Sequence, residues 1–146
     1  MKEDTFKFGW TQETIFCINL TKLIDDKNIT ITKTDDQFCS VDFIIQYKNK
    51  RVMLELKSRR QDLSKYSDLF INTNKLHTIE SLYKNIPTLL VWSDTFSNVY
   101  FTTYNEKLLQ SPTQFSNGGC AFKINKKVCL ETNELLVDTI KTMLFQ

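Results

Sequence analysis

Glycine is scarce in this chain of 146 residues, which contains only three, and proline occurs only twice. With so few glycines there is no glycine-rich phosphate-binding loop, which argues against a P-loop nucleotide hydrolase. The sequence has no apolar run of about 18 residues or more, so we expect no membrane-spanning helix. Residues 1–4 are not followed by an apolar signal region, and we therefore expect an intracellular protein.

Histidine and cysteine are also poorly placed for a zinc site. His77 is the only histidine, and the four cysteines, at positions 17, 39, 120 and 129, form no C-x-x-C pair. A structural zinc site is therefore not expected. Since intracellular thiols stay reduced, we expect free and mostly buried cysteines. The net charge is only +2, so a nucleic-acid interface would need a local concentration of basic residues.

Hydrophobic residues make up 41% of the chain, which is enough for one ordinary domain with a real core. Their periodicity predicts helices over 10–24, from 72 or 73 to 83, over 106–110 and over 134–144. It predicts strands over 40–47, 51–57, 88–92 and 98–103, and a strand pair formed by 121–124 and 128–130. Loops are expected over 58–67 and 111–119. The simplest account is a single mixed α/β domain spanning residues 1–146.

Two ionisable residues of opposite charge share one face of the second expected strand. Side chains alternate along a strand, so Glu55 and Lys57 lie opposite the face of its apolar, even-numbered neighbours. A two-residue turn at 49–50 would place Lys48 opposite Arg51 and Asp42 opposite Lys57. Asp42, Glu55 and Lys57 would then share a face. A four-residue loop gives the same result, whereas a three-residue loop turns Asp42 away unless a bulge restores it.

Two carboxylates and an ammonium group held together suit metal-assisted phosphate chemistry. Carboxylate oxygens are ligands for Mg²⁺, which keeps several waters and binds substrate phosphate, and Mn²⁺ can substitute for it. The main-chain carbonyl of Leu56 would supply a further oxygen. Lys57 would orient the attacking water or stabilise the charge that develops on phosphorus. The alternative is an ordinary solvated strand end, since an Asp some way before Glu-x-Lys arises by chance in many proteins.

The pattern Val41-Asp42, twelve residues, then Glu55-Leu56-Lys57 resembles the PD-(D/E)XK nuclease superfamily. Val41 stands where the family name has proline, which many members also lack. The resemblance covers roughly Gly9 to Tyr104 and leaves 105–146 unassigned. It implies a restriction-endonuclease-like α/β core, a mixed central sheet flanked by helices. It also implies metal binding by Asp42 and Glu55 and a catalytic role for Lys57.

Glu13 is a third acidic candidate. It lies on the apolar stripe of the first expected helix, where a carboxylate is costly unless a cation meets it. Members of the superfamily often place a glutamate on this helix facing the metal, and Glu13 resembles it. The alternative is an acidic residue in the helix's first turn, favoured by the helix dipole.

Basic residues follow the motif directly. Arg59, Arg60 and Lys65 would grip phosphates beside the metal, or else belong to a solvated basic loop. Similar small nucleases of phages and mobile elements show a Tyr, an apolar run and a helical Lys. Tyr66, the run 69–71 and Lys75 resemble that pattern. Lys75 would touch the scissile phosphate or lie on the surface.

Together these features favour a Mg²⁺-dependent endonuclease acting on DNA, and Holliday junction resolvases resemble the chain in size. Branched DNA is therefore a candidate substrate, and a homodimer would allow two strands to be cut. A viral member of such a family would act in the host nucleus, and any other in the cytoplasm. One alternative is an RNA endonuclease, because 2′-hydroxyl contacts cannot be read from a sequence. Another is an inactive nucleic-acid-binding protein that keeps the fold.

Overall fold

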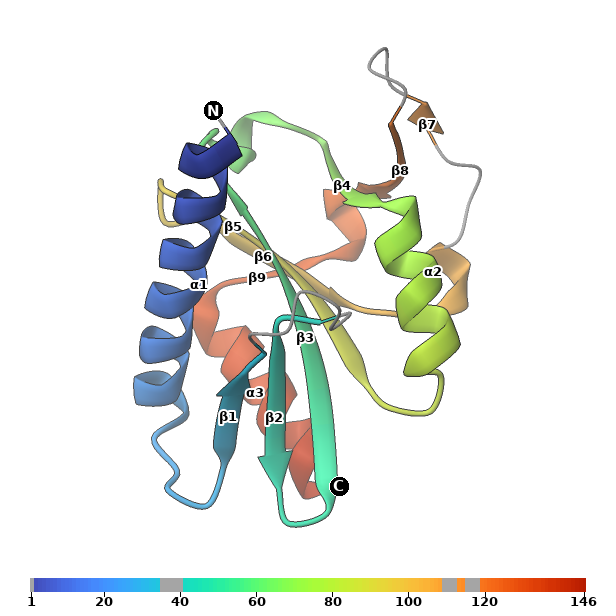
Figure 1. Cartoon of the computed structure of the whole chain (residues 1–146). Helices are drawn as coiled ribbons and strands as arrows, with labels where there is room; N and C mark the ends of the chain where they lie inside the picture. The colour runs from blue at the N-terminus through green and yellow to red at the C-terminus, as the bar shows by residue number, and fades with distance from the viewer. Residues whose placement is uncertain (1, 35–40, 109–112, 115–118) are drawn as a thin grey trace.

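The computed structural model describes residues 2–34, 41–108, 113–114 and 119–146, and Figure 1 shows its arrangement. The helices are α1 (Lys2–Ile24), α2 (Thr73–Leu82) and α3 (Asn133–Phe145), and the short 3₁₀ turns are η1 (Leu63–Lys65), η2 (Glu106–Leu108) and η3 (Lys126–Val128). The strands are β1 (Thr30–Lys33), β2 (Phe43–Tyr47), β3 (Lys50–Arg59), β4 (Asp68–Asn72), β5 (Thr88–Asp94), β6 (Val99–Thr103), β7 (Thr113–Gln114), β8 (Cys120–Asn125) and β9 (Leu130–Glu131).

A mixed sheet forms the centre of the molecule, with strand order β1-β2-β3-β5-β6-β9. Strands β3 and β5 run parallel, and the other pairs of this sheet are antiparallel. Helices α1 and α3 cover one face of the sheet, while α2 and a small sheet of order β4-β8-β7 lie on the other (Figure 1). The expected mixed sheet with helices on both faces is confirmed.

The alternation of β3 divides the core into two clusters. Val52, Leu54 and Leu56 pack with the buried residues of α1 and α3. Met53, on the opposite face, packs with α2 and the small sheet, in a cluster that also contains Trp92 of β5. Because β3 is buried on both faces, a charged residue on it is held by the whole fold.

Helix boundaries follow local capping where the sequence supplies it. Of the two candidate caps, Asn72 and Thr73, it is Asn72 that caps α2, its side chain accepting a hydrogen bond from the N–H of Asn74 at 2.8 Å. Helix α1 instead begins at Lys2, eight residues before the expected Trp10, because residues 2–9 include helix-favouring Lys and Glu but carry no apolar helical period. No helix within the described ranges is both long and apolar enough to cross a bilayer.

The predicted pairing of 121–124 with 128–130 is wrong. Asn125 caps η3 by accepting a hydrogen bond from the N–H of Lys127, so the chain turns away instead of forming a hairpin. Strand β8 pairs with β4 and β7, and β9 pairs with β6. The predicted loop 58–67 begins with the end of β3 and contains η1. Of the short helix expected over 106–110, residues 106–108 form the 3₁₀ turn η2, and 109–110 lie outside the described residues. Of the loop expected over 111–119, residues 113–114 form β7, and 111–112 and 115–118 lie outside the described residues.

The cysteines are less buried than expected. Cys17, Cys120 and Cys129 are free and half-buried, and Cys39 lies outside the described residues.

Candidate active site

The β2–β3 hairpin brings Asp42 beside Glu55. Tyr47 pairs with Lys50 and Phe43 with Leu54, and Asp42 lies one residue before β2. The expected pairing of Asp42 with Lys57 is wrong, because the observed register is shifted by two residues along β3. The turn consists of residues 48 and 49 instead of 49 and 50, with a left-handed φ of 55° at residue 48. This turn also has an even length, and the carboxylate of Asp42 lies beside that of Glu55.

Asp42 replaces a missing strand partner at this position. Its N–H donates to the carbonyl of Leu54 at 3.1 Å, and its carboxylate Oδ2 accepts a hydrogen bond from the N–H of Leu56 at 2.7 Å. The side chain of Asp42 thus accepts a hydrogen bond from a main-chain N–H of β3 just before β2 begins. The bond fixes the Asp42 carboxylate beside the end of β3, next to Glu55.

Glu55 is the most unusual residue of the site. Its side chain is 1% exposed, and neither carboxylate oxygen accepts a hydrogen bond from any described group. Ammonium groups approach Oε2, from Lys75 at 3.2 Å and from Lys57 at 3.6 Å. Burial, followed by the neighbouring Asp42, raises the pKa of Glu55 well above its ordinary value. A buried carboxyl group with vacant acceptor positions is costly, and a bound cation would compensate for it.

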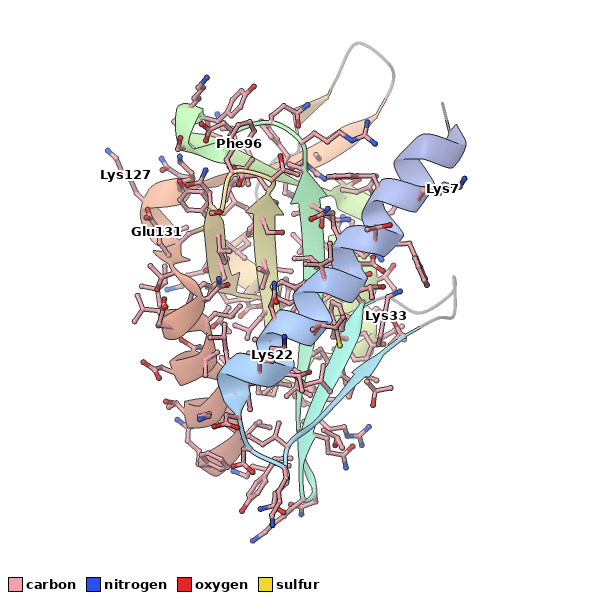
Figure 2. All side chains as sticks on the ribbon, turned by 90° about the vertical axis from the view of Figure 1, so that its left-hand side faces the viewer. Lys7, Lys22, Lys33, Phe96, Lys127 and Glu131 are labelled. Atoms are coloured by element: carbon pink, nitrogen blue, oxygen red, sulfur yellow. The ribbon has the colours of Figure 1, made fainter. Side chains whose placement is uncertain are left out.

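Helix α1 adds a third carboxylate. Burial raises the pKa of Glu13 to about 7, and the adjacent Asp42 contributes to the rise. Lys33, on β1, forms an ion pair with Glu13 at 3.6 Å and also lies over the ring of Trp10, 4.6 Å from its centre. Figure 2 shows Lys33 beside α1. Asp42 therefore lies between two carboxyl groups, one from a helix and one from a strand.

Lys33 was not singled out from the sequence. The strand that carries it, β1, has only four residues and was not predicted, so no pattern placed Lys33 near the motif. A positive charge suits this position, because Lys33 contacts both the Glu13 carboxylate and the face of the Trp10 ring.

Within the described ranges, no group of three or more His, Cys, Asp or Glu side chains is arranged to hold an ion. The observation that fits a metal is instead the buried carboxylate of Glu55, which accepts no hydrogen bond within the described residues and lies beside the fixed carboxylate of Asp42. Oxygen donors of this kind match a hard cation such as Mg²⁺.

The basic candidates fall into two groups. Lys75, in the first turn of α2, is directed into the site, where it pairs with Glu55. Arg59 is half-buried at the end of β3, Arg60 lies over the ring of Phe8 on α1 at 4.5 Å, and Lys65 is exposed on η1. Arg59, Arg60 and Lys65 therefore lie along the end of β3 and the segment that follows it.

His77 lies outside this constellation. It is exposed on α2 and meets the ring of Phe122 edge-on at 5.6 Å.

No family model matches the chain, and no curated protein sequence matches it either. The structure is similar to the solved structure of Hjc from Archaeoglobus fulgidus, a Holliday junction resolvase from an archaeal hyperthermophile. The match covers 84% of this chain and 90% of the resolvase, with a TM-score of 0.54 and 13% identity. The two chains share a fold. The expected restriction-endonuclease-like architecture, a mixed central sheet flanked by helices, is thereby confirmed.

Proposed function

We propose that this chain is a divalent-metal-dependent endonuclease that hydrolyses phosphodiester bonds in DNA, with residues 1–146 forming one catalytic domain. The observation that carries the proposal is the buried Glu55 carboxylate, which accepts no hydrogen bond within the described residues and is balanced there only by ion pairs at one of its oxygens. It lies beside Asp42 and between two ammonium groups. A purely structural glutamate would be expected to have its oxygens hydrogen-bonded.

Asp42 and Glu55 would hold Mg²⁺ or Mn²⁺, together with the carbonyl of Leu56 and with Glu13. Such a cation, when bound, supplies an activated water and neutralises charge at the reacting phosphate. The hydrogen bond from the N–H of Leu56 holds Asp42 in place, and Lys33 offsets the charge of Glu13.

Lys57 and Lys75 would act on the substrate. Both ammonium groups lie against Glu55, so a phosphate at the site would meet two positive charges. Lys57 would orient the attacking water or donate a hydrogen bond to a phosphate oxygen. Lys75, on helix α2, would hold the scissile phosphate. Arg59, Arg60 and Lys65 would contact neighbouring phosphates.

Junction DNA is the first substrate to test, because a Holliday junction resolvase shares the fold. A homodimer would present two such sites to two strands. Linear, branched and single-stranded DNA and the matching RNAs form the substrate panel.

The decisive experiment compares cleavage of labelled substrates by the unmodified protein, Asp42→Asn and Glu55→Gln, with Mg²⁺ and with EDTA. We expect EDTA to abolish cleavage and each substitution to lower it by roughly a hundredfold or more, because ligand and water activation are lost together. Asp138→Asn, at an exposed position on α3, is the matched control and should cleave normally. Cleavage that survives EDTA or both substitutions would contradict the proposal.

A further inference from the structure

A cavity of about 250 Å³ lies immediately beyond the candidate site, at the end of β3. Trp92, Tyr66, Phe70 and Arg59 are among the residues that line it. Trp92 is level with Lys57 on the neighbouring parallel strand β5. Arg59 follows Lys57 by two residues, roughly 6.6 Å along the strand, and alternation places both on the same face. The cavity therefore lies next to Lys57 along β3, and Lys57 is the residue that we propose acts on the reacting phosphate.

Three of the eight residues that line this cavity are aromatic, namely Tyr66, Phe70 and Trp92. Trp92 is only 1% exposed, with its indole N–H donating to the carbonyl of Phe70 at 3.0 Å, so it contributes to the floor of the cavity. Tyr66 is 52% exposed and provides an aromatic surface that a ligand can reach. Aromatic rings of this kind stack on nucleobases with little regard to sequence, because every base has a π face.

Arg59 brings a positive charge to the cavity, and Asp68, another lining residue, brings a negative one. The Arg59 guanidinium is half-buried, and burial lowers its pKa. It donates to the neighbouring main-chain carbonyl of Ser58 at 3.1 Å, and none of the ion pairs among the described residues involves it. A partly desolvated guanidinium that is not ion-paired suits a phosphate or the acceptor edge of a base.

Hydrogen bonds hold the wall that carries Tyr66. The N–H of Leu63, another lining residue, donates to Asp94 at 2.7 Å, and the ammonium of Lys126 donates to the carbonyl of Leu63 at 2.9 Å. The 3₁₀ turn η1, which begins at Leu63, is therefore fixed to the main sheet and to η3. A preformed pocket loses less entropy when a ligand binds.

We propose that this cavity binds one unpaired nucleobase of the substrate strand, next to the nucleotide whose phosphate is cleaved. The base would pack against the aromatic walls, and Arg59 would contact its edge or its phosphate. Since drawing a paired base out of a duplex costs energy, the site would favour DNA in which that nucleotide is already unpaired. This inference rests on the proposed function, because it assumes that the strand crosses the Asp42–Glu55 site.

The test uses binding in place of cleavage. Glu55→Gln combined with Trp10→Phe prevents turnover and leaves Trp92 as the single tryptophan. Single-stranded oligonucleotides are titrated in Mg²⁺, each with one abasic residue moved stepwise along the strand. We expect binding to quench Trp92 emission and one abasic position to weaken Kd by roughly 5- to 150-fold, as the loss of one stacked base implies. Equal affinities at all positions, or Trp92 emission that does not respond to bound DNA, would overturn the inference.

Tyr66→Ala in the same background tests the assignment to this cavity. It should weaken binding of the intact oligonucleotide and remove the penalty at the sensitive abasic position, because the base has lost its partner. Phe96→Ala is the matched control, since Phe96 is 57% exposed and lies in the β5–β6 turn outside the cavity. A penalty that persists in Tyr66→Ala, or that disappears equally in Phe96→Ala, would assign the base to another surface.

The two proposals fail in different ways. If quenching of Trp92 emission depends on the base, but the unmodified protein shows no metal-dependent cleavage, the nuclease proposal is refuted and the pocket proposal stands. Cleavage with no base-dependent binding would retain the nuclease and refute the pocket. A complete lack of binding by every oligonucleotide would refute the pocket, and cleavage would then decide the nuclease.

Discussion

At the scale of single residues, the carboxyl groups of the site oppose folding. Glu55 and Glu13 are both removed from water and both lie beside Asp42, so ionising them in the folded chain is costly. Lys33, Lys57 and Lys75 offset part of that cost through ion pairs. Accumulated negative charge of this kind is typical of sites that bind cations or transfer protons.

The free energy of unfolding of the metal-free protein should therefore depend on pH through Glu13. Its pKa is about 7 in the folded chain and near 4.5 when unfolded, so the folded state binds more protons between these values. Stability is full below about pH 4.5 and falls as pH rises towards 7. Glu13→Gln should raise stability at pH 8 by about 1 kcal/mol after allowance for solvent screening, a rise in Tm of roughly 3 °C, and change little at pH 4. Thermal melts in EDTA measure this, and equal effects at both pH values would refute it.

A substitution of Lys57 should lower catalysis without weakening metal binding. An ammonium group is not a metal ligand, so Lys57→Ala should leave the affinity for Mn²⁺ within a few-fold. Cleavage should fall by roughly 10²- to 10³-fold, since a donor to the reacting phosphate is lost. Isothermal titration with Mn²⁺ and single-turnover cleavage measure the two quantities. Lys84→Ala, in the exposed turn after α2, should alter neither. A large loss of Mn²⁺ affinity would show that Lys57 chiefly organises the carboxylates.

At the scale of elements, patterns that span a few residues were reliable. The cap at Asn72, the apolar strands around the motif and the even turn between them could all be predicted, because each depends on near neighbours. The register differs from the expected one by two residues, since both possible two-residue turns satisfy the same alternation, and the observed turn has a left-handed conformation at residue 48. The pairing of β8 with β4 could not be predicted, because strands separated by some fifty residues meet through packing that no local pattern encodes.

The carboxylate of Asp94 makes most of the hydrogen bonds at the contact between the segment after β3 and the β5–β6 turn, where Asp62 also accepts one from the side chain of Asn98. Asp94 accepts hydrogen bonds from the N–H groups of Leu63, Phe96 and Asn98 and from the side chain of Asn98. Burial alone would raise the pKa of Asp94, but these hydrogen bonds hold it below its ordinary value. The stabilisation is therefore present above about pH 4 and is lost as pH falls through the lowered pKa.

Asp94→Ala should release this segment. We expect a loss of about 1–3 kcal/mol of stability at pH 7, because main-chain donors lose their acceptor, and faster hydrogen exchange at the amide of Leu63. Denaturant unfolding and exchange measured by NMR test both effects. Asp138→Ala on α3 is the control and should leave the Leu63 amide unchanged. Unaltered exchange in Asp94→Ala would show that the contacts of Lys126 suffice to hold η1.

At the scale of the whole molecule, charge is almost balanced, so DNA binding must depend on where the cations lie. Six basic residues surround the carboxylates or follow β3, namely Lys33, Lys57, Arg59, Arg60, Lys65 and Lys75. Five of the six could be singled out from the sequence, and Lys33 could not, because it comes from β1, a strand of only four residues. Glu13 was found because helical periodicity already set it apart.

Salt dependence measures this surface directly. Each phosphate contact contributes roughly −0.7 to −0.9 to the slope of log K against log salt. Lys65→Ala should therefore make the slope less negative by about one contact, whereas Lys22→Ala, on the exposed side of α1 shown in Figure 2, should not alter it. Fluorescence anisotropy with an inactive variant over a range of NaCl concentrations gives both slopes. Identical slopes for the two variants would place the DNA elsewhere.

The hairpin turn at residues 48 and 49 has a practical consequence for engineering. The tip lies at the end of β2 and β3 that is far from Asp42 (Figure 1). The length of the turn affects the face on which Asp42 lies only through being odd or even. Residues grafted there in pairs would lengthen the ribbon into solvent and leave the carboxylates in phase, whereas a single inserted residue would rotate Asp42 to the opposite face unless a bulge absorbed it. The tip is thus a natural place to splice in a fluorophore-bearing or affinity peptide, provided that the graft adds an even number of residues.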